Sequence, residues 1–223
     1  TDYFAPGFTS YEHQIQYQTY DVTKALAADN QLKVTVAGGW AAGSFNHVRK
    51  SHISCDRQAF LGEVYLEYTD GSREIIATDE SWQVTENSPF SLAEWYDGET
   101  YDATFDEGAA NWRQADVTRP RGEPKLLAQY GAPVRAFETM HPVCQTIAPT
   151  GELVYDFGQN FAGVIHARIK QADKSQTIAF RHAEVLSGGE LFVKSLRTAK
   201  ATATYTSKEG AQAYSPRFTY MGF

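Results

Sequence analysis

Short runs of alternating apolar and polar residues, separated by polar turns, are the feature that most limits how this chain can fold. The clearest case spans residues 62–77, where two alternating runs flank a turn that contains Asp70 and Gly71. Side chains alternate between the two faces of a strand, and an Asp-Gly pair favours a tight turn, so this segment is predicted to be a β-hairpin. The same reasoning predicts further strands at residues 13–20, 32–36, 82–84, 134–137, 153–157, 164–169 and 177–181.

The spacing of these strands indicates the fold class. Strands that recur about every ten residues with polar turns between them are typical of β-sandwiches and jelly rolls. We therefore predict an all-β protein of antiparallel β-sandwiches, with one short helical turn at residues 21–26. The stretch 119–124 reads Arg-Pro-Arg-Gly-Glu-Pro, a composition typical of interdomain linkers. It divides the chain into two predicted units, 1–122 and 123–223.

Composition excludes several classes of partner. Hydrophobic residues make up 42% of the chain, with thirteen Tyr and thirteen Phe, which favours a folded, strand-rich protein over disorder. The net charge of −7 and the lack of a basic cluster argue against binding to nucleic acid. No apolar stretch approaches the roughly 20 residues of a membrane-spanning helix. The first residues do not resemble a signal peptide, so the compartment stays open, with a cytoplasmic location slightly favoured.

The two cysteines, Cys55 and Cys144, could pair with each other, but they lack the spacing of a metal or redox motif, and two buried free thiols are the preferred prediction. Near the first of them, His47, His52 and Asp56 offer ligand types for zinc. Their spacing fits no common zinc pattern, and a surface loop explains them more simply.

Five segments combine aromatic, glycine and acidic residues in a characteristic order. They lie at residues 5–11 together with 17–23, at 95–103, at 155–163, at 181–186 and at 216–223. In this order they resemble the front half of bacterial α-L-rhamnosidases, across almost the whole chain.

The resemblance implies an amino-terminal sandwich that binds sugar in some members, followed by a concanavalin-like sandwich. The catalytic carboxylates of the family, which the resemblance implies to act with inversion, lie later in a helical barrel. The chain is thus expected to be a non-catalytic fragment, trimmed at both ends, and the completeness of its second sandwich is left open. Its expected partners are rhamnose-containing glycosides and the catalytic barrel of the same polypeptide. A free-standing carbohydrate-binding module and a purely structural module are the alternatives.

Candidate sugar-binding residues are Trp40, Trp95, Tyr96, Asp97 and Glu99. Sugar rings stack their C–H faces on aromatic rings, while nearby carboxylates bond their hydroxyl groups. Asp97 and Glu99 also have the residue types of a hydrolytic pair. The preferred interpretation of these two acids is structural: Asp97 and Gly98 form a turn, and one of the acids caps it or pairs with an arginine.

A second set of polar residues follows the predicted linker: Asp156, Gln159, Asn160, His182 and Glu184. The residues around Gly158 are interpreted as a turn between strands, and 181–184 as a strand end with an ion pair. In the intact enzyme these turns are expected to support the interface with the barrel rather than catalysis.

No metal or other cofactor is expected. Some family members bind calcium in the first sandwich, and the frequent Gly-Asp-Gly-Trp of the family reads Ala37-Gly38-Gly39-Trp40 here. Calcium binding through Asp29 and Asn30, or through Asn87, is a less favoured alternative because a site needs several oxygen ligands.

Overall fold

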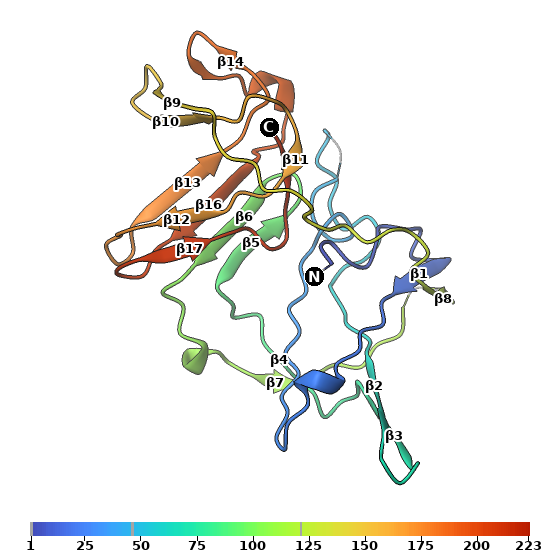
Figure 1. Ribbon diagram of the computed structural model, residues 1–223. Coiled ribbons are helices and arrows are strands. Elements are labelled where there is room, and N and C mark those ends of the chain that lie inside the picture. Colours follow the sequence, from blue (N-terminus) through green and yellow to red (C-terminus); the bar gives the residue numbers. More distant parts are fainter. Residues whose placement is uncertain (1, 46, 121) are drawn as a thin grey trace.

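The computed structural model describes residues 2–45, 47–120 and 122–223, and these residues are almost entirely in strands and irregular segments (Figure 1). The strands before the predicted linker are β1 Gln14–Tyr17, β2 Glu63–Glu67, β3 Arg73–Ala77, β4 Gln83–Val84, β5 Phe90–Glu94, β6 Gly98–Asp102 and β7 Arg113–Gln114. Those after it are β8 Lys125–Ala128, β9 Cys144–Ile147, β10 Leu153–Asp156, β11 Ala162–Gly163, β12 Ala167–Ile169, β13 Thr177–Arg181, β14 Leu186–Ser187, β15 Glu190–Leu191, β16 Thr202–Thr206, β17 Gln212–Tyr214 and β18 Met221–Gly222. Three short 3-10 helices are η1 Thr23–Ala25, η2 Glu107–Ala109 and η3 Lys194–Leu196.

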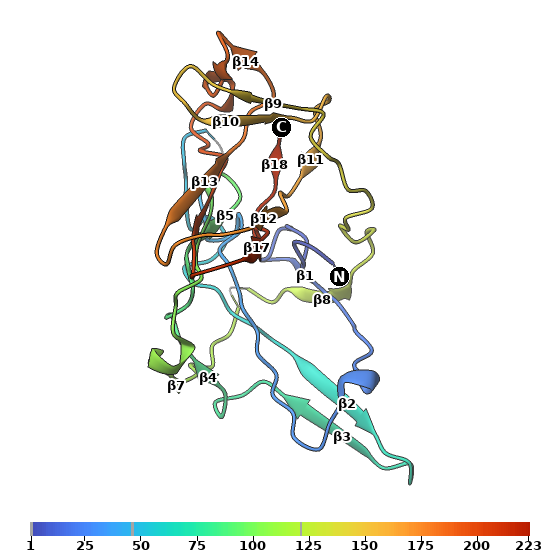
Figure 2. The same ribbon diagram turned by 60° about the vertical axis from the view of Figure 1, so that its left-hand side comes forward.

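The largest sheet has four strands in the order β13-β16-β6-β5. Its central pair, β6 and β16, runs parallel with Gly98 opposite Thr202, whereas β5 and β13 pair antiparallel at the two edges. A ribbon of β12 and β17 lies against this sheet on one side (Figures 1 and 2). This sheet therefore combines residues from before and after the predicted linker.

A small aromatic core fills the space between the sheet and the ribbon. Ala203, Tyr205 and Tyr214 are buried there, and partly buried side chains from neighbouring strands pack around them. The Tyr101 and Tyr205 rings are stacked because these residues lie opposite each other on parallel strands, 5.9 Å between ring centroids. Burial of such large rings is a main source of stability for a sandwich.

The all-β sandwich class is thus confirmed, although two of the strand pairings are parallel. The second parallel pair joins β1 to β8, with Gln14 opposite Lys125, and a bridge between Tyr3 and Val134 lies nearby. The division of the chain at residue 122 stays a prediction. The β1–β8 pair and the Tyr3–Val134 bridge both join a residue before position 122 to one after it.

Local predictions were confirmed where a partner strand is close in sequence. The hairpin forms as β2 and β3, and Gly71 supplies the positive φ of 83° that its turn requires. The helical turn at residues 21–26 forms as η1. The strand expected at 13–20 is shorter and is limited to β1, the part that pairs with β8.

Two strand predictions were wrong. Residues 32–36 form no strand, and Leu32 and Val36 are exposed. At 134–137 only a single bridge at Val134 forms. Both segments alternate as strands do, but an alternating segment becomes part of a sheet only when another strand pairs with it.

The prediction of buried thiols was wrong for Cys144, which is exposed, while Cys55 is half-buried. Cys144 lies at the start of the β9–β10 hairpin, where nothing covers its side chain. In the part of the chain that the structure describes, no helix is both long and apolar enough to cross a membrane.

Candidate functional site

The turn that joins β5 to β6 carries three of the five predicted sugar-binding residues, Trp95, Tyr96 and Asp97. Gly98, which ends the turn, has a φ of 114°. A Cβ at this position would lie 2.0 Å from the carbonyl oxygen of Thr202, so only glycine lets β6 approach β16 this closely. The shape of the turn is therefore fixed by the sheet behind it.

The structure brings Trp95 and Trp40 together from segments that are far apart in sequence. Their ring centroids are 4.4 Å apart, and both side chains are half-buried. Further rings pack around this pair, with centroid distances to one or the other of 5.3–5.8 Å, and we call the whole group the aromatic cluster: Phe4, Phe8, Trp40, Phe45, Trp95 and Tyr220.

The aromatic cluster adjoins a hollow. Phe8 belongs to the cluster, is 40% exposed, and lines a cavity of about 460 Å³ with Tyr11, Ile53 and several polar side chains. The indole N–H of Trp40 is buried and has no hydrogen-bond partner among the described residues. A buried donor without a partner is rare. This N–H is free to donate a hydrogen bond, although it has almost no accessible surface of its own.

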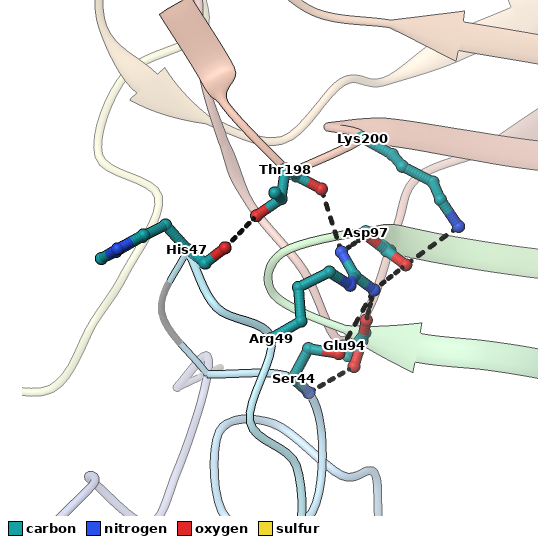
Figure 3. Close-up of polar contacts among 7 residues, drawn as sticks. All are labelled: Ser44, His47, Arg49, Glu94, Asp97, Thr198 and Lys200. Carbon is teal, nitrogen blue, oxygen red and sulfur yellow. Dashed lines mark hydrogen bonds and ion pairs between the residues drawn. The ribbon is translucent and has the colours of Figure 1, made fainter.

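Asp97 is an acceptor of several bonds within the protein (Figure 3). Arg49 donates from Nη1 to Oδ1 at 2.8 Å and from Nη2 to Oδ2 at 2.7 Å, and Nζ of Lys200 lies 3.0 Å from Oδ2. The hydrogen bonds from Arg49 are the main cause that lowers the pKa of Asp97. The predicted pairing of one of these acids with an arginine is thus confirmed for Asp97.

Glu94, at the end of β5, extends the same network. Its Oε2 accepts a hydrogen bond of 2.7 Å from the backbone N–H of Ser44, and its Oε1 lies 3.8 Å from Nη2 of Arg49. The loop at 43–45 and 47–50 is thereby held against the β5–β6 turn. This places Phe45 of the aromatic cluster next to Trp40.

Glu99 lies apart from the aromatic cluster, in the interior. It is 0% exposed, and its carboxylate accepts bonds from the hydroxyl of Tyr214 and from the backbone N–H groups of Arg217 and Phe218. Burial raises the pKa of Glu99, and the three hydrogen bonds oppose that rise. Burial and the neighbouring carboxylate also raise the pKa of Tyr214. This geometry gives Glu99 a structural role and no open path to a solute.

The second predicted set is divided between surface and interior. Asp156, Gln159 and Asn160 are exposed around the bend after β10, where Asp156 accepts a bond from the backbone N–H of Gly158, as expected for a turn. His182 is 5% exposed, donates from Nδ1 to the carbonyl oxygen of Ala201 at 2.9 Å, and packs on Phe223.

The strand end with an ion pair predicted at residues 181–184 forms, since β13 ends at Arg181 and its guanidinium lies 3.1 Å from Glu152 on the neighbouring hairpin. Glu184 is exposed and takes no part in this ion pair. Side chains three residues apart in an extended segment point to opposite faces, so Arg181 does not meet Glu184, whereas the adjacent hairpin brings Glu152 into reach.

The sequence reasoning missed Arg49 and Lys200, which hold Asp97. Neither lies in a motif, and both act across a large separation in sequence. The family-like segment 5–11 did contain a usable signal, since it includes Phe8 and Tyr11 beside the cavity.

No group of three or more His, Cys, Asp or Glu side chains that could hold a metal ion occurs in residues 2–45, 47–120 and 122–223. His47, His52 and Asp56 thus form no such group with Cys55. Asp29, Asn30 and Asn87 are exposed, and the side chains of Asn30 and Asn87 bond to nearby backbone groups.

Comparison with known proteins places this fold in a class. Residues 1–138 match the family model described as the α-L-rhamnosidase N-terminal domain, and residues 146–223 match the bacterial α-L-rhamnosidase concanavalin-like domain. These are the non-catalytic β-sandwich regions of a glycoside hydrolase. The chain belongs to the bacterial α-L-rhamnosidase family.

Similar proteins agree with this assignment. An α-L-rhamnosidase from Streptomyces avermitilis is 37% identical over 238 residues, and one from Alteromonas sp. (strain LOR) is 30% identical over 232 residues. Both matches cover 100% of this chain but only 22% and 25% of those relatives. The chain therefore spans about a quarter of the length of the curated relatives it matches.

Solved structures give the same result. The crystal structure of the Streptomyces avermitilis α-L-rhamnosidase complexed with L-rhamnose matches with a TM-score of 0.86 and 35% identity, covering 100% of this chain and 22% of that one. The native enzyme from Aspergillus terreus matches with a TM-score of 0.83 and 33% identity, covering 100% of this chain and 27% of that one.

Proposed function

We propose that this chain is part of an enzyme that hydrolyses terminal α-L-rhamnosides, and that the chain itself contacts rhamnose-containing carbohydrate through the aromatic cluster. The match of the whole chain to α-L-rhamnosidases supports the first part. The observation that carries the second part is the half-buried pair of Trp40 and Trp95, which Phe8 connects to an open cavity. An inverting course of hydrolysis stays a prediction.

The chemistry of the aromatic cluster fits a deoxysugar. The methyl group and C–H faces of rhamnose are apolar and favour contact with indole and phenyl rings. Its hydroxyl groups need donors and acceptors, which the polar side chains around the cavity can supply. Tyr96 is a further candidate because it follows Trp95 in the turn. Asp97 and Glu99, whose carboxylates are buried, support the turn and the interior instead.

Titration with L-rhamnose tests this binding. We expect a saturable change in tryptophan fluorescence, with or without calcium, that is lost in Trp40→Ala and in Trp95→Ala. Trp112→Ala is the matched control, since Trp112 is 47% exposed and lies outside the aromatic cluster. A wild-type chain whose fluorescence does not respond to rhamnose would refute the proposed contact.

An assay with an aryl α-L-rhamnoside tests the absence of catalysis in this chain. We expect no turnover, because the two acids closest to a hydrolytic pair are engaged: Asp97 with Arg49 and Lys200, and Glu99 with three interior donors. Turnover that disappears in Asp97→Asn or Glu99→Gln would overturn this expectation.

A second candidate function is support of the catalytic barrel, and one observation favours it. The chain exposes 16060 Å² of surface, whereas a compact monomer of 24.8 kDa exposes about 10,000 Å². Some of the exposed apolar side chains lie at one end, on β9, β10 and β14, namely Ile147, Leu153, Tyr155 and Leu186. Figures 1 and 2 both place these hairpins together at the same end of the molecule.

This apolar end also carries Asp156, Gln159 and Asn160, the residues predicted to support the barrel interface. Its two hairpins are joined because Glu190 accepts bonds from the backbone N–H and the hydroxyl of Thr150, at 2.9 and 3.0 Å. Large exposed apolar patches mark sites that another protein surface covers. Amide hydrogen exchange of β9 and β10 should therefore be slower in the full-length enzyme than in this chain. Equal exchange rates would remove this candidate.

A further inference from the structure

The side chain of Asp97 is the common partner of two cations from distant parts of the chain. It is 5% exposed, and it binds Arg49 from the loop before β2 and Lys200 from the segment before β16 (Figure 3). Arg49 also donates from Nη1 to the carbonyl of Thr198 at 2.9 Å, and the Thr198 hydroxyl donates to the carbonyl of His47 at 3.2 Å. The two segments are thereby joined to each other as well as to Asp97.

The backbone of the same turn is held from the same side. The carbonyl of Tyr96 accepts bonds from the N–H groups of Lys200 and Ala201, at 3.1 and 3.3 Å, and the N–H of Thr202 donates to the carbonyl of Asp97 at 3.1 Å. Residues 198–202 therefore contact the turn through both main chain and side chains. They belong to the region of the second family model, whereas the turn belongs to the first.

The position of Trp95 follows from the position of this turn. Its ring packs on Trp40 and Phe4 of the first region and on Tyr220 of the second, with centroid distances of 4.4, 5.6 and 5.7 Å. Tyr220 is 37% exposed, so it forms part of the accessible edge of the aromatic cluster. A shift of the turn would move one indole of the pair relative to the other.

We propose that Arg49 and Lys200 are positioning residues: they fix the Trp95 turn, so that the sugar-contacting surface is built jointly by the two family regions. This inference rests on the proposed function of the aromatic cluster. Neither residue belongs to the aromatic cluster or lines the cavity beside it. They act by balancing the charge of Asp97 and Glu94, the two acids at the turn.

The chemistry of the two cations gives them different tolerance to substitution. Arg49 donates to both oxygens of Asp97, a planar two-point contact that the single ammonium group of lysine cannot reproduce. Lys200 acts as a point charge at 66% side-chain exposure, so the loss of its charge should shift the turn without unfolding the chain. Removal of either cation leaves an excess of negative charge at a buried carboxylate.

The test uses two readouts on the full chain. Circular dichroism measures the exciton coupling between the indoles of Trp40 and Trp95 in the absence of sugar, and Trp95→Phe identifies this signal by removing it. Fluorescence titration then measures the affinity for L-rhamnose. The variants are Lys200→Met and Arg49→Lys, and Lys174→Met is the matched control, because Lys174 is exposed in a loop away from the turn.

We expect both variants to reduce the exciton coupling and to weaken rhamnose binding severalfold, while Lys174→Met changes neither. Added salt should reduce the coupling in the wild type more than in Lys200→Met, because it screens the exposed Lys200 charge. Unchanged coupling in both variants would overturn the proposal, as would reduced coupling with unchanged rhamnose affinity. Reduced coupling in a chain that never binds rhamnose would refute the proposed function and leave the positioning of the aromatic cluster intact.

Discussion

The guanidinium of Arg49 donates hydrogen bonds to both carboxylate oxygens of Asp97, at 2.8 and 2.7 Å. The two residues are 48 positions apart, and their contact joins a loop to the turn that carries Trp95. An acid that looked like a candidate ligand thus serves to hold the turn in place. The effects of the Arg49–Asp97 contact on stability, pH dependence and binding can each be measured.

Replacement of Asp97 by asparagine should lower the free energy of unfolding at pH 7 by about 1–3 kcal/mol, because two cations lose their acceptor charge. Arg49 holds the pKa of Asp97 below its ordinary value of 3.8. The carboxylate therefore contributes stability that is present above pH 3.8 and is lost as pH falls through the lower pKa of the folded state. Urea unfolding should show the wild type and variant converging in acid. An equal difference at all pH values, or a like effect in the exposed control Asp29→Asn, would contradict this.

Replacement of Glu99 by alanine should be among the most destabilising changes in the chain. It leaves the Tyr214 hydroxyl and the N–H groups of Arg217 and Phe218 without their acceptor in the interior, at a cost of at least about 3 kcal/mol. Glu99→Gln should cost less, since the amide oxygen still accepts. Urea denaturation checks this, and Glu107→Ala, at an exposed ion pair, is the control. Similar losses for Glu99→Ala and Glu107→Ala would argue against a structural role for Glu99.

Burial of His182 should make the chain less stable in mild acid. Burial lowers the pKa of His182 below its ordinary value of 6.5, and the bond to the Ala201 carbonyl partly offsets the effect. The neutral ring contributes stability that is present above pH 6.5 and is lost as pH falls towards the folded-state pKa. The melting temperature of His182→Gln should therefore change less than that of the wild type between neutral and mildly acidic pH. The exposed control His141→Gln should behave as the wild type; if His182→Gln does so too, the prediction fails.

Replacement of Gly98 by alanine should cost on the order of 3 kcal/mol, from its φ of 114° and the close approach of the Thr202 carbonyl. Gly131→Ala is a suitable control, because a Cβ there meets no atom within 4 Å and its φ is not positive. Thermal unfolding of the two variants compares the positions directly. A Gly98→Ala chain as stable as the wild type would show that β6 and β16 do not pack as described.

The fold could be predicted from the sequence wherever structure depends on local pattern. The β2–β3 hairpin is an example, because its turn and both of its strands lie within one short segment. The parallel pairing of β6 with β16 could not be predicted, since nothing in either strand specifies a partner about a hundred residues away. The strand expected at 32–36 failed for the same reason.

The candidate site, too, could be predicted from the sequence only in part. Chemistry alone identified Trp40 and Trp95 as rings that suit a sugar, and the structure places them in contact. It could not identify Arg49 or Lys200, because single charged residues carry no pattern. Nor could it separate Asp97 from Glu99: both are acids two residues apart, yet one faces the loop and the other the interior.

Saturation-transfer difference NMR with L-rhamnose tests the central claim, that the aromatic cluster contacts the sugar, most directly. With the wild-type chain we predict transfer of saturation to the methyl and ring C–H protons of rhamnose. This transfer should be lost in Trp95→Ala and retained in Trp112→Ala. No transfer in the wild type, or equal transfer in wild type and Trp95→Ala, would contradict the claim.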